Sequence, residues 1–583
     1  MLHTLTRSLR ENKGPALVTV LLSALEVVFE IVIPLFMSNL IDFGIEGGSM
    51  AAVWKFGAFL LLLAAFQLAT GVLAARIAAR ASVGFAANLR EDMYNNVQTF
   101  AFSNIDKFST ASIVTRLTTD TTNVQNAFQM LMRMAIRAPV MLIFSMIVSF
   151  RISHDISMTF LIILPILALA LFFIIRSVFP VFTRVFRTYD ELNNVVQENV
   201  RGIRVVKSFN QERHEIGKFG AISERIYKDF SKGERLITLN APLMQFCIYT
   251  CMIVISWLGA KAIIASGNDP ALGLTTGNLT ALITYTMQIL SSLMMLSMVF
   301  AMLTISLSSA RRIAEVLEEQ SDIPQPERPV MTVCDGAVDF DHVSFVYASK
   351  ADKKVLDDID LHIRSGETIG IIGGTGASKS SLVQLIPRLY DVTGGKLTLG
   401  GVDVRDYDLD TLRGAVAMVL QKNELFSGTI AENLRWGNEN ATDEQLRHAC
   451  KLACADGFIS AMPDGYDTHI EQGGTNVSGG QKQRLCIARA LLKKPKVLIL
   501  DDSTSAVDTR TDAQIQQALS TYIPDTTKII IAQRISSVQN ADRIVVLDDG
   551  HIDAVGCHDE LLRTCEIYRE VYESQQKGGE DDA

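Results

Sequence analysis

The first half of the chain contains six apolar stretches separated by polar segments. Each stretch is close to the ~20 residues that a helix needs to cross the hydrocarbon core of a bilayer. The pattern therefore predicts six membrane-spanning helices. They are placed at about 16–41, 56–76, 134–150, 156–175, 236–260 and 276–306.

The polar segments between these spans alternate between short and very long. The two long segments, 77–133 and 176–235, are rich in Lys and Arg, whereas the three short ones carry few. Because basic loops are retained on the cytoplasmic side of a membrane, this distribution places both long segments and both termini in the cytoplasm. We therefore expect a multi-pass protein of the plasma membrane, in contact with membrane lipid.

Both long segments keep a helical apolar period instead of becoming loops. Each has enough residues for two helices that continue about 40 Å beyond the bilayer and meet at a turn. We expect these turns near Thr99–Phe108 and Ser208–Phe219. They are candidate docking elements for a cytoplasmic partner.

The pattern changes after residue 320, which ends the predicted membrane domain of residues 1–320. A proline-rich linker follows at 321–332. From 333 to 575, short strands alternate with turns and helices, which indicates an α/β domain. The last residues, 576–583, are expected to form a disordered acidic tail.

Composition supports a chain divided between membrane and water. At 583 residues it is too long for one hydrophobic core, and its mean hydropathy of +0.24 is high for a soluble protein and low for an all-membrane one. A net charge of −9 gives no reason to expect nucleic acid as a partner. Cys450 and Cys454 lack a second pair to complete a zinc site, so the scattered cysteines are interpreted as small buried residues in a reducing compartment. The N-terminal pattern predicts no signal peptide.

A glycine-rich stretch, Gly370 to Ser381, stands between an apolar strand and a segment with helical spacing of apolar residues. Such a turn points successive backbone N–H groups into one hollow, which binds phosphate at the positive end of the helix. Lys379 would reach the β- and γ-phosphates of a nucleotide, and the Ser380 hydroxyl would bind Mg²⁺. Ser378 departs from the strict pattern, which has glycine there, and would do no harm if it adopted helical dihedrals. The candidate nucleotide-binding residues of this loop are Gly373, Gly374, Thr375, Gly376, Ala377, Ser378, Lys379, Ser380 and Ser381.

Two features of the predicted spans are candidates for a substrate cavity. Glu26 and Glu30 lie at i, i+4 on the first span, where a carboxylate is costly and should face a wet cavity or a partner. They either contact a cationic substrate or form a gating hydrogen bond, or else they make a structural contact to a neighbouring helix. Met294 and Met298 belong to a Met-rich sixth span that suits a promiscuous apolar cavity, although thioethers fill ordinary helix contacts equally well.

Further motifs lie in a fixed order along the α/β segment. An apolar strand ends in Asp501, as in the Walker B motif, where the carboxylate holds the magnesium shell. Tyr347 resembles the aromatic residue on which adenine stacks, Gln421 resembles the Q-loop glutamine, and Gln533 stands at the switch-histidine position. The segment Val477, Ser478, Gly479, Gly480 and Gln481 resembles the signature loop of ABC transporters, and Ser505, Ala506, Val507 and Asp508 resemble their D-loop.

With six spans upstream, this ordered set resembles an ABC exporter half-transporter over nearly the whole chain. The resemblance implies a six-span α-helical exporter domain with long cytoplasmic helix extensions, followed by an α/β P-loop ABC ATPase domain. It implies ATP and Mg²⁺ as cofactors, with Ser380, Gln421 and Asp501 as the magnesium ligands. Two half-transporters would pair, with each ATP held between the Walker motifs of one chain and the signature loop of the other. Closure would then switch the side to which the cavity opens, a population shift driven by ATP.

Two residues with expected catalytic roles depart from the family pattern. The residue after Walker B should be a glutamate that polarises the attacking water, and Asp502 is one methylene shorter, a displacement that can cost ~100-fold in rate. Gln533 can donate a hydrogen bond but cannot carry the charge of the histidine it replaces. Gln421 is the third candidate catalytic residue, after Asp502 and Gln533. Lys379 and Asp501 are intact, so the two changes suggest a site that binds ATP and seldom cleaves it.

This combination resembles the degenerate-site subunit of bacterial heterodimeric multidrug-type ABC exporters. We expect a different half-transporter as partner, one that supplies the missing glutamate and histidine, in the bacterial plasma membrane with the ATPase domain in the cytoplasm. The expected function is ATP-driven export of a small molecule, lipid or peptide. The alternative is a regulatory nucleotide-sensing subunit that gates its partner without transporting by itself.

Overall fold

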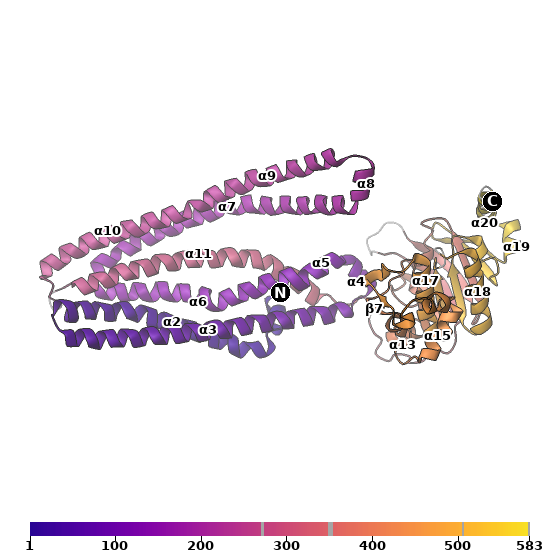
Figure 1. Cartoon of the computed structure of the whole chain (residues 1–583), viewed down its shortest axis with the longest axis horizontal. Helices are drawn as coiled ribbons and strands as arrows, with labels where there is room; N and C mark the ends of the chain where they lie inside the picture. The colour runs from indigo at the N-terminus through magenta and orange to yellow at the C-terminus, as the bar shows by residue number, and fades with distance from the viewer. Residues whose placement is uncertain (270–272, 348–353, 504–506, 581–583) are drawn as a thin grey trace. The chain divides into compact units, whose positions relative to one another are not determined.

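The computed structural model describes residues 1–269, 273–347, 354–503 and 507–580 (Figure 1). It divides into two compact units. One comprises Met1–Gln98 and Thr110–Glu319, and the other comprises Thr99–Ser109 and Gln320–Ala583. Each unit is described by itself.

Among its described residues, the first unit contains helices and no strands. Its helices are α1 (Leu2–Arg7), η1 (Arg10–Asn12), α2 (Lys13–Asn39), η2 (Leu40–Glu46), α3 (Met50–Gln98), α5 (Thr110–Thr115), η3 (Arg116–Asp120), α6 (Thr121–Ile152), α7 (His154–Arg201), α8 (Ile203–Ser208), α9 (Glu212–Thr238), α10 (Asn240–Ser266) and α11 (Thr276–Glu318). Within the described residues, six helical segments are long and apolar enough to cross a membrane. They confirm the six-span prediction for this half of the fold.

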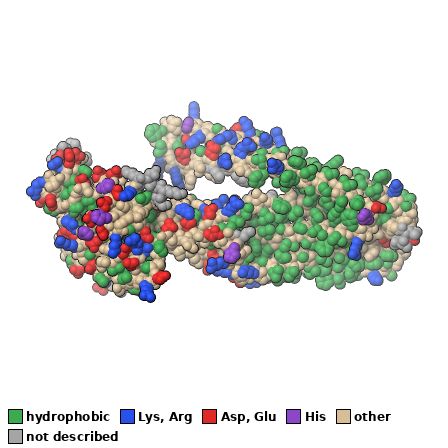
Figure 2. Space-filling view, turned by 180° about the vertical axis from the view of Figure 1, so that it is seen from behind, with side chains coloured by type: hydrophobic (Ala, Val, Ile, Leu, Met, Phe, Trp, Pro, Cys, Tyr) green, Lys and Arg blue, Asp and Glu red, His purple; other side chains and the backbone are tan. Residues whose placement is uncertain are grey.

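Large hydrophobic side chains cover much of the outer surface of this unit, as Figure 2 shows for one face. Leu61, Leu68, Ile162 and Ile264 are among those exposed. A water-soluble bundle would bury such residues, so the exposed apolar surface is explained by lipid contact. Charged side chains gather instead toward one end of the unit.

The long polar segments continue the spanning helices without a break. α3 has 49 residues and α7 has 48 (Figure 1). Both continue far past the apolar part of their sequence. At about 1.5 Å per residue each is roughly 70 Å long, more than twice the thickness of the hydrocarbon core. The excess length accommodates the Lys and Arg residues outside the bilayer.

The second turn between long helices lies earlier than Ser208–Phe219, so that prediction was wrong in its bounds. α7 ends at Arg201, α8 follows, and α9 already begins at Glu212. Gly202 caps α7, Asn210 adopts the left-handed φ of 53° that a tight turn needs, and two glutamates in the first turn of α9 favour a helix start.

The second unit contains strands and short helices. The strands are β1 (Val338–Phe345), β2 (Leu356–Ile363), β3 (Thr368–Gly373), β4 (Gly394–Leu399), β5 (Val402–Asp403), β6 (Val416–Val419), β7 (Gly428–Thr429), β8 (His469–Ile470), β9 (Val497–Asp501), β10 (Thr527–Ile531), β11 (Arg543–Asp548) and β12 (His551–Gly556). The helices are α4 (Phe102–Lys107), α12 (Lys379–Leu385), α13 (Leu409–Ala415), α14 (Ile430–Arg435), α15 (Asp443–Leu452), α16 (Asp456–Ser460), η4 (Gly465–Asp467), η5 (Gln472–Gly474), α17 (Gly479–Leu492), α18 (Thr509–Tyr522), η6 (Ile535–Ser537), α19 (His558–Thr564) and α20 (Glu566–Glu580). This mixture confirms the predicted α/β domain.

A six-stranded sheet in the order β12-β11-β3-β10-β9-β6 forms the centre of this unit. From β11 to β6 the neighbouring strands are parallel, and only β12 pairs antiparallel. The central strands are buried on both faces because helices cover one side and the four-stranded sheet β2-β1-β4-β5 packs on the other. Parallel order brings the carboxyl ends of β3, β10, β9 and β6 to one edge.

The predicted docking turn near Thr99–Phe108 forms α4 and groups with the second unit. Tyr390 holds it there, because its hydroxyl donates to Asp106 Oδ2 at 2.8 Å and its ring lies 6.0 Å from that of Phe102. Burial, and then the contact with Asp106, raise the pKa of Tyr390. The hydroxyl therefore remains a neutral donor at any physiological pH.

Two smaller expectations need correction. α20 continues to Glu580, so part of the tail expected to be disordered at 576–583 is helical, and Gln576 donates to the Tyr572 hydroxyl one turn earlier at 2.6 Å. All eight cysteines are free, as expected, but Cys334 and Cys557 are exposed and not buried. The described residues contain no cluster of three His, Cys, Asp or Glu side chains suited to a metal.

Candidate functional site

The glycine-rich loop connects β3 to α12 at the edge where the parallel strands end. Gly373 is required by close packing, because a Cβ there would lie 2.1 Å from the Leu547 carbonyl oxygen. Gly376 has a φ of +89°, which favours glycine. Lys379 is the first residue of α12, and its Nζ donates to the carbonyls of Gly373 at 2.7 Å and Gly374 at 2.8 Å.

The Lys379 ammonium is held over the loop by these carbonyls. Burial lowers its pKa, and the nearby carboxylates of Asp501 and Asp502 oppose that effect. A phosphate entering the loop would replace the two carbonyl acceptors with stronger, charged ones. The loop is thus arranged for an anionic ligand.

Ser378 is the N-cap of α12, and its dihedrals are φ 66° and ψ 21°. The serine was expected to be harmless only if it had helical dihedrals, and its backbone is left-handed instead. A residue with a Cβ pays roughly 1–2 kcal/mol for this conformation, which glycine avoids. Ser378 is a strained position inside the loop.

The magnesium ligands expected from sequence lie at the same edge. Asp501 ends β9 and is 3% exposed, and Ser380 lies in the first turn of α12. Burial raises the pKa of Asp501, while a hydrogen bond to Ser380 opposes the change. A hydroxyl beside a buried carboxylate fits a hard divalent cation, because oxygen ligands and the positive charge would offset the cost of burying Asp501.

Asp502, Gln421 and Gln533 come together although they lie far apart in sequence. Gln533 follows β10, Gln421 follows β6, and Asp502 follows β9, which lies between those two strands. Both amides donate to the same oxygen, Asp502 Oδ2, at 2.9 Å from Gln533 Nε2 and 3.3 Å from Gln421 Nε2. Asp502 Oδ2 is thus already an acceptor for two donors.

Tyr347 follows β1, on the second sheet of this unit. Its hydroxyl lies 2.7 Å from Ser381 Oγ, which ties it to the start of α12. The ring makes edge contacts with Phe345 and Tyr390, at 4.8 and 5.1 Å between ring centroids, and 44% of the residue is exposed. An exposed aromatic surface next to the phosphate loop can stack on a base.

The loop Val477–Gln481 begins α17. Ser478 is its N-cap, with Oγ accepting from the Gln481 N–H at 3.3 Å and Gln481 Oε1 accepting from the Ser478 N–H at 2.9 Å. Ser478 and Gly479 are exposed. A capped helix N-terminus that faces solvent presents N–H groups and a hydroxyl to an anion from outside the unit.

Of the predicted D-loop, Ser505 and Ala506 lie outside the described residues. Val507 is buried, and Asp508 is the N-cap of α18, where its side chain accepts from the Thr511 N–H at 2.9 Å. That backbone hydrogen bond lowers the pKa of Asp508. Its visible role is to start the helix.

In the helical unit, Glu26 and Glu30 both bind Arg137 of α6. Arg137 Nη1 lies 2.8 Å from Glu26 Oε1, and Nη2 lies 2.7 Å from Glu30 Oε2. Glu26 is packed so closely that a Cβ on Gly71 of α3 would lie 3.2 Å from its Oε1. The three charges form one cluster that joins α2 to α6.

Arg137 was missed by the sequence analysis. The available signal was a cation inside an apolar stretch, which requires a partner in a membrane just as a carboxylate does. Met294 and Met298 on α11 are both exposed, which leaves their thioethers accessible.

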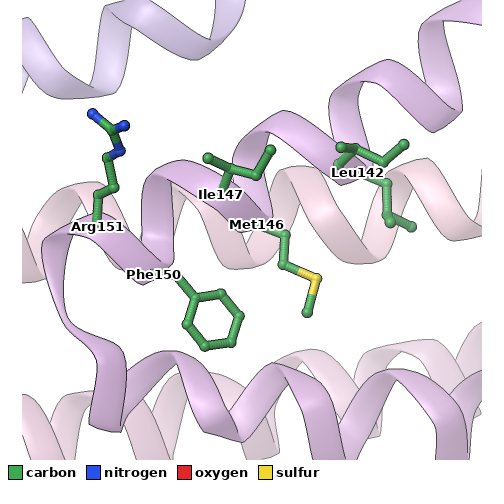
Figure 3. A pocket seen from close by; sticks show the side chains of 6 residues that line it. Leu142, Met146, Ile147, Phe150 and Arg151 are labelled. Carbon is green, nitrogen blue, oxygen red and sulfur yellow. The ribbon is translucent and has the colours of Figure 1, made fainter.

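A hollow of about 530 Å³ lies elsewhere in the helical unit, along one face of α6. Leu142, Met146, Phe150 and Arg151 line it, with Ile143 and Ile147 between them (Figure 3). All of these residues come from α6, and the hollow includes none of the residues proposed from sequence for a substrate cavity. It fits the apolar surface that faces lipid.

Comparison with known proteins assigns both units. Residues 16–309 match the model of the ABC transporter transmembrane region, and residues 356–505 match that of the ABC transporter. The uncharacterized ABC transporter ATP-binding protein YfiB of Bacillus subtilis is 36% identical over 561 residues, or 96% of each chain. An uncharacterized ABC transporter ATP-binding protein of Mycobacterium tuberculosis is 33% identical over 580 residues, which covers 99% of this chain and 98% of the relative.

A solved structure shares the fold over both units. It is that of a bacterial Atm1-family ABC exporter with ATP bound, and it aligns with a TM-score of 0.82 at 23% identity. The alignment covers 97% of this chain and 99% of the other. The exporter type of architecture is therefore common to the two proteins.

Proposed function

This chain belongs to the ABC transporter family, as a half-transporter that joins one transmembrane domain to one ATP-binding domain, and we propose that it is the degenerate-site subunit of a heterodimeric exporter. Its own site would bind ATP and hydrolyse it slowly, while its signature loop would complete a competent site on the partner. The observation that carries this proposal is the arrangement around Asp502, where a short carboxylate accepts hydrogen bonds from two glutamine amides.

ATP binding is assigned to the loop from Gly373 to Ser381, with adenine on the exposed ring of Tyr347. Lys379 would exchange its two carbonyl acceptors for phosphate oxygens. Ser380, Asp501 and Gln421 would hold Mg²⁺, which neutralises phosphate charge when bound. For Gln421 this requires its side-chain oxygen to face the metal, which is compatible with its Nε2 donating to Asp502.

Slow hydrolysis follows from the geometry and the chemistry of the same residues. A group that polarises the attacking water needs a free lone pair at the correct distance, and Asp502 is both shorter than glutamate and already bound through Oδ2. Gln533 Nε2 donates one of its two N–H groups to Asp502, and its neutral amide gives the γ-phosphate neither the positive charge nor the proton of a histidine. Both features leave phosphate binding intact.

The intact signature loop supports a role in a second site. Ser478 uses its oxygen as an acceptor within the capping box, so its O–H proton can still be donated to a γ-phosphate. Gly479 and Gly480 would add backbone N–H groups at the helix N-terminus. If two copies of this chain paired, both ATP sites would lack the glutamate and the histidine, and an intact signature loop would serve no purpose. The loop therefore favours a different partner that carries both residues.

We propose that this cycle drives the export of a small molecule, lipid or peptide across the bacterial plasma membrane. Both termini and the ATPase domain would lie in the cytoplasm. Met294 and Met298 are proposed to line the cavity. Glu26 and Glu30 are proposed as a structural contact, because Arg137 already binds both carboxylates. A regulatory subunit that gates its partner without transporting is the second candidate, favoured by the same features of Asp502 and Gln533.

Purification of the tagged chain from its native host tests the proposal. We expect a second half-transporter with Glu and His at the two positions to co-purify in equal amount, and the complex in lipid nanodiscs to show ATPase activity that transport substrates stimulate. A homodimer of this chain with full hydrolytic activity would contradict it. Nucleotide-dependent transport by the partner in the absence of this chain would support the regulatory role instead.

A further inference from the structure

The geometry points to Gln575 of the C-terminal helix α20 as a positioning residue for the segment Gln533–Ile535, which we call the switch loop of the ATP site. Its amide makes two hydrogen bonds to the main chain of that loop. Gln575 Nε2 donates to the Gln533 carbonyl at 2.8 Å, and Gln575 Oε1 accepts from the Ile535 N–H at 2.9 Å. We propose that Gln575 fixes Gln533 against Asp502 and thereby sets how long ATP is retained.

The two bonds act on one short segment of backbone. Gln533 and Ile535 are separated by a single residue, so a planar amide that binds both resembles a neighbouring β-strand. Gln533 lies two residues beyond β10, where strand pairing has ended and the chain turns into η6. Gln575 therefore provides main-chain hydrogen bonds to this segment just beyond the end of the sheet.

α20 is itself firmly attached to the ATPase domain. Tyr568 is fully buried, and its hydroxyl lies 2.7 Å from His558 Nδ1 at the start of α19. Burial raises the pKa of Tyr568 to about 12, which keeps the hydroxyl neutral. Val571 and Tyr572 pack against the same core one turn later. The side chain at position 575 is therefore carried by an anchored helix and not by a loose end.

The connection to the ATP site runs through Gln533. Its carbonyl is held by Gln575, and its side chain is 2.9 Å from Asp502 Oδ2, so one residue receives both contacts. Loss of the Gln575 amide would let the peptide between Gln533 and Arg534 rotate. The second Nε2 N–H of Gln533, which the bond to Asp502 leaves able to donate to a bound γ-phosphate, would then move out of place. This inference requires ATP binding at the P-loop and does not depend on the identity of the partner.

The test uses the full-length chain with any co-purifying partner, in nanodiscs with Mg²⁺. The dissociation of radiolabelled ATP is followed after dilution into unlabelled ATP. Gln575→Met keeps the length of the side chain and removes both hydrogen bonds. Gln576→Met is the matched control, because Gln576 binds only the hydroxyl of Tyr572 on its own helix among the described residues.

We expect the Gln575→Met variant to release ATP about three- to tenfold faster than the unsubstituted chain. A change of this size corresponds to the loss of roughly one hydrogen bond that holds Gln533 in place. Gln576→Met should match the unsubstituted chain. In a Gln533→Ala background, Gln575→Met should have no further effect, because the group through which it acts is gone. An unchanged rate in Gln575→Met, or an effect that adds fully to that of Gln533→Ala, would overturn the inference.

Hydrogen exchange gives a second readout that does not depend on turnover. The Ile535 amide should lose protection in Gln575→Met and keep it in Gln575→Glu, since a carboxylate still accepts from that N–H. Gln575→Glu should nonetheless speed ATP release, because it cannot donate to the Gln533 carbonyl. Equal exchange at Ile535 in all variants would show that the contact does not form in solution.

Discussion

Replacement of Ser378 by glycine should stabilise the ATPase domain. The serine has φ 66° and ψ 21°, a left-handed conformation that costs a residue with a Cβ roughly 1–2 kcal/mol. Glycine removes this cost but adds about 0.5–1 kcal/mol of backbone entropy to the unfolded state. The net gain should be about 0.5–1 kcal/mol, which raises the Tm of a domain of this size by about 1–4 °C.

The assay can report on this domain alone. The chain has three tryptophans, and in a Trp54→Phe, Trp257→Phe background the remaining one, Trp436, lies in the ATPase domain. Both replaced residues are exposed on the helical unit, where phenylalanine is tolerated. Thermal unfolding of the full-length chain in nanodiscs is then followed by tryptophan fluorescence with and without Ser378→Gly.

Ser520→Gly is the matched control. Ser520 lies inside α18, is exposed and has no positive φ, so the same substitution should destabilise the domain by about 0.5–1 kcal/mol. The two variants should therefore shift the Tm in opposite directions. A lower or unchanged Tm for Ser378→Gly would refute the argument that backbone strain is present in the loop.

Four further outcomes are expected. Asp502→Glu alone should leave turnover of the complex within about twofold, because Gln533 still lacks the contact of a histidine and such groups act together; a several-fold rise would count against this. Gly479→Asp should nearly abolish ATPase activity by placing negative charge where the partner's phosphate binds, and surviving activity would exclude the proposed pairing of sites. Lys379→Ala should weaken ATP binding to this chain in photolabelling, yet reduce total hydrolysis less than the same change in the partner. Arg137→Ala should cost about 1–3 kcal/mol in thermal stability of the membrane domain, with partial recovery on adding Glu30→Gln, because it leaves two carboxylates unpaired.

The helices and the central sheet were predictable because each depends on local pattern. Apolar stretches of about 20 residues require helices in a bilayer, and basic residues in 77–133 and 176–235 required those helices to continue into water. The strand–loop–helix around Gly373 to Ser381 followed from glycine placement. Its one unexpected feature, the left-handed Ser378, could not be predicted, since a serine is compatible with either hand until the loop around it is built.

The contacts that connect distant parts of the chain were beyond sequence reasoning. Arg137 meets Glu26 and Glu30 because of how α6 is rotated against α2, and rotation depends on packing along the whole helix. Gln575 and Gln533 are 42 residues apart, and Gln575 is an exposed amide on an amphipathic helix, with nothing local to mark it. The meeting of Asp502, Gln421 and Gln533 was foreseen as a group only through family resemblance, whereas their shared oxygen emerged from strand order.

The most direct test of the proposed degenerate site is the identity of the nucleotide that each subunit holds during turnover. The complex would be incubated with photoreactive azido-ATP labelled at either the α- or the γ-phosphate, crosslinked, and separated into its subunits. We expect this chain to retain the γ-label, since we propose that Lys379 and Asp501 hold ATP and that Asp502 and Gln533 support only slow cleavage. The partner should carry the α-label alone, as ADP. Loss of the γ-label from both subunits at the same rate would contradict the account.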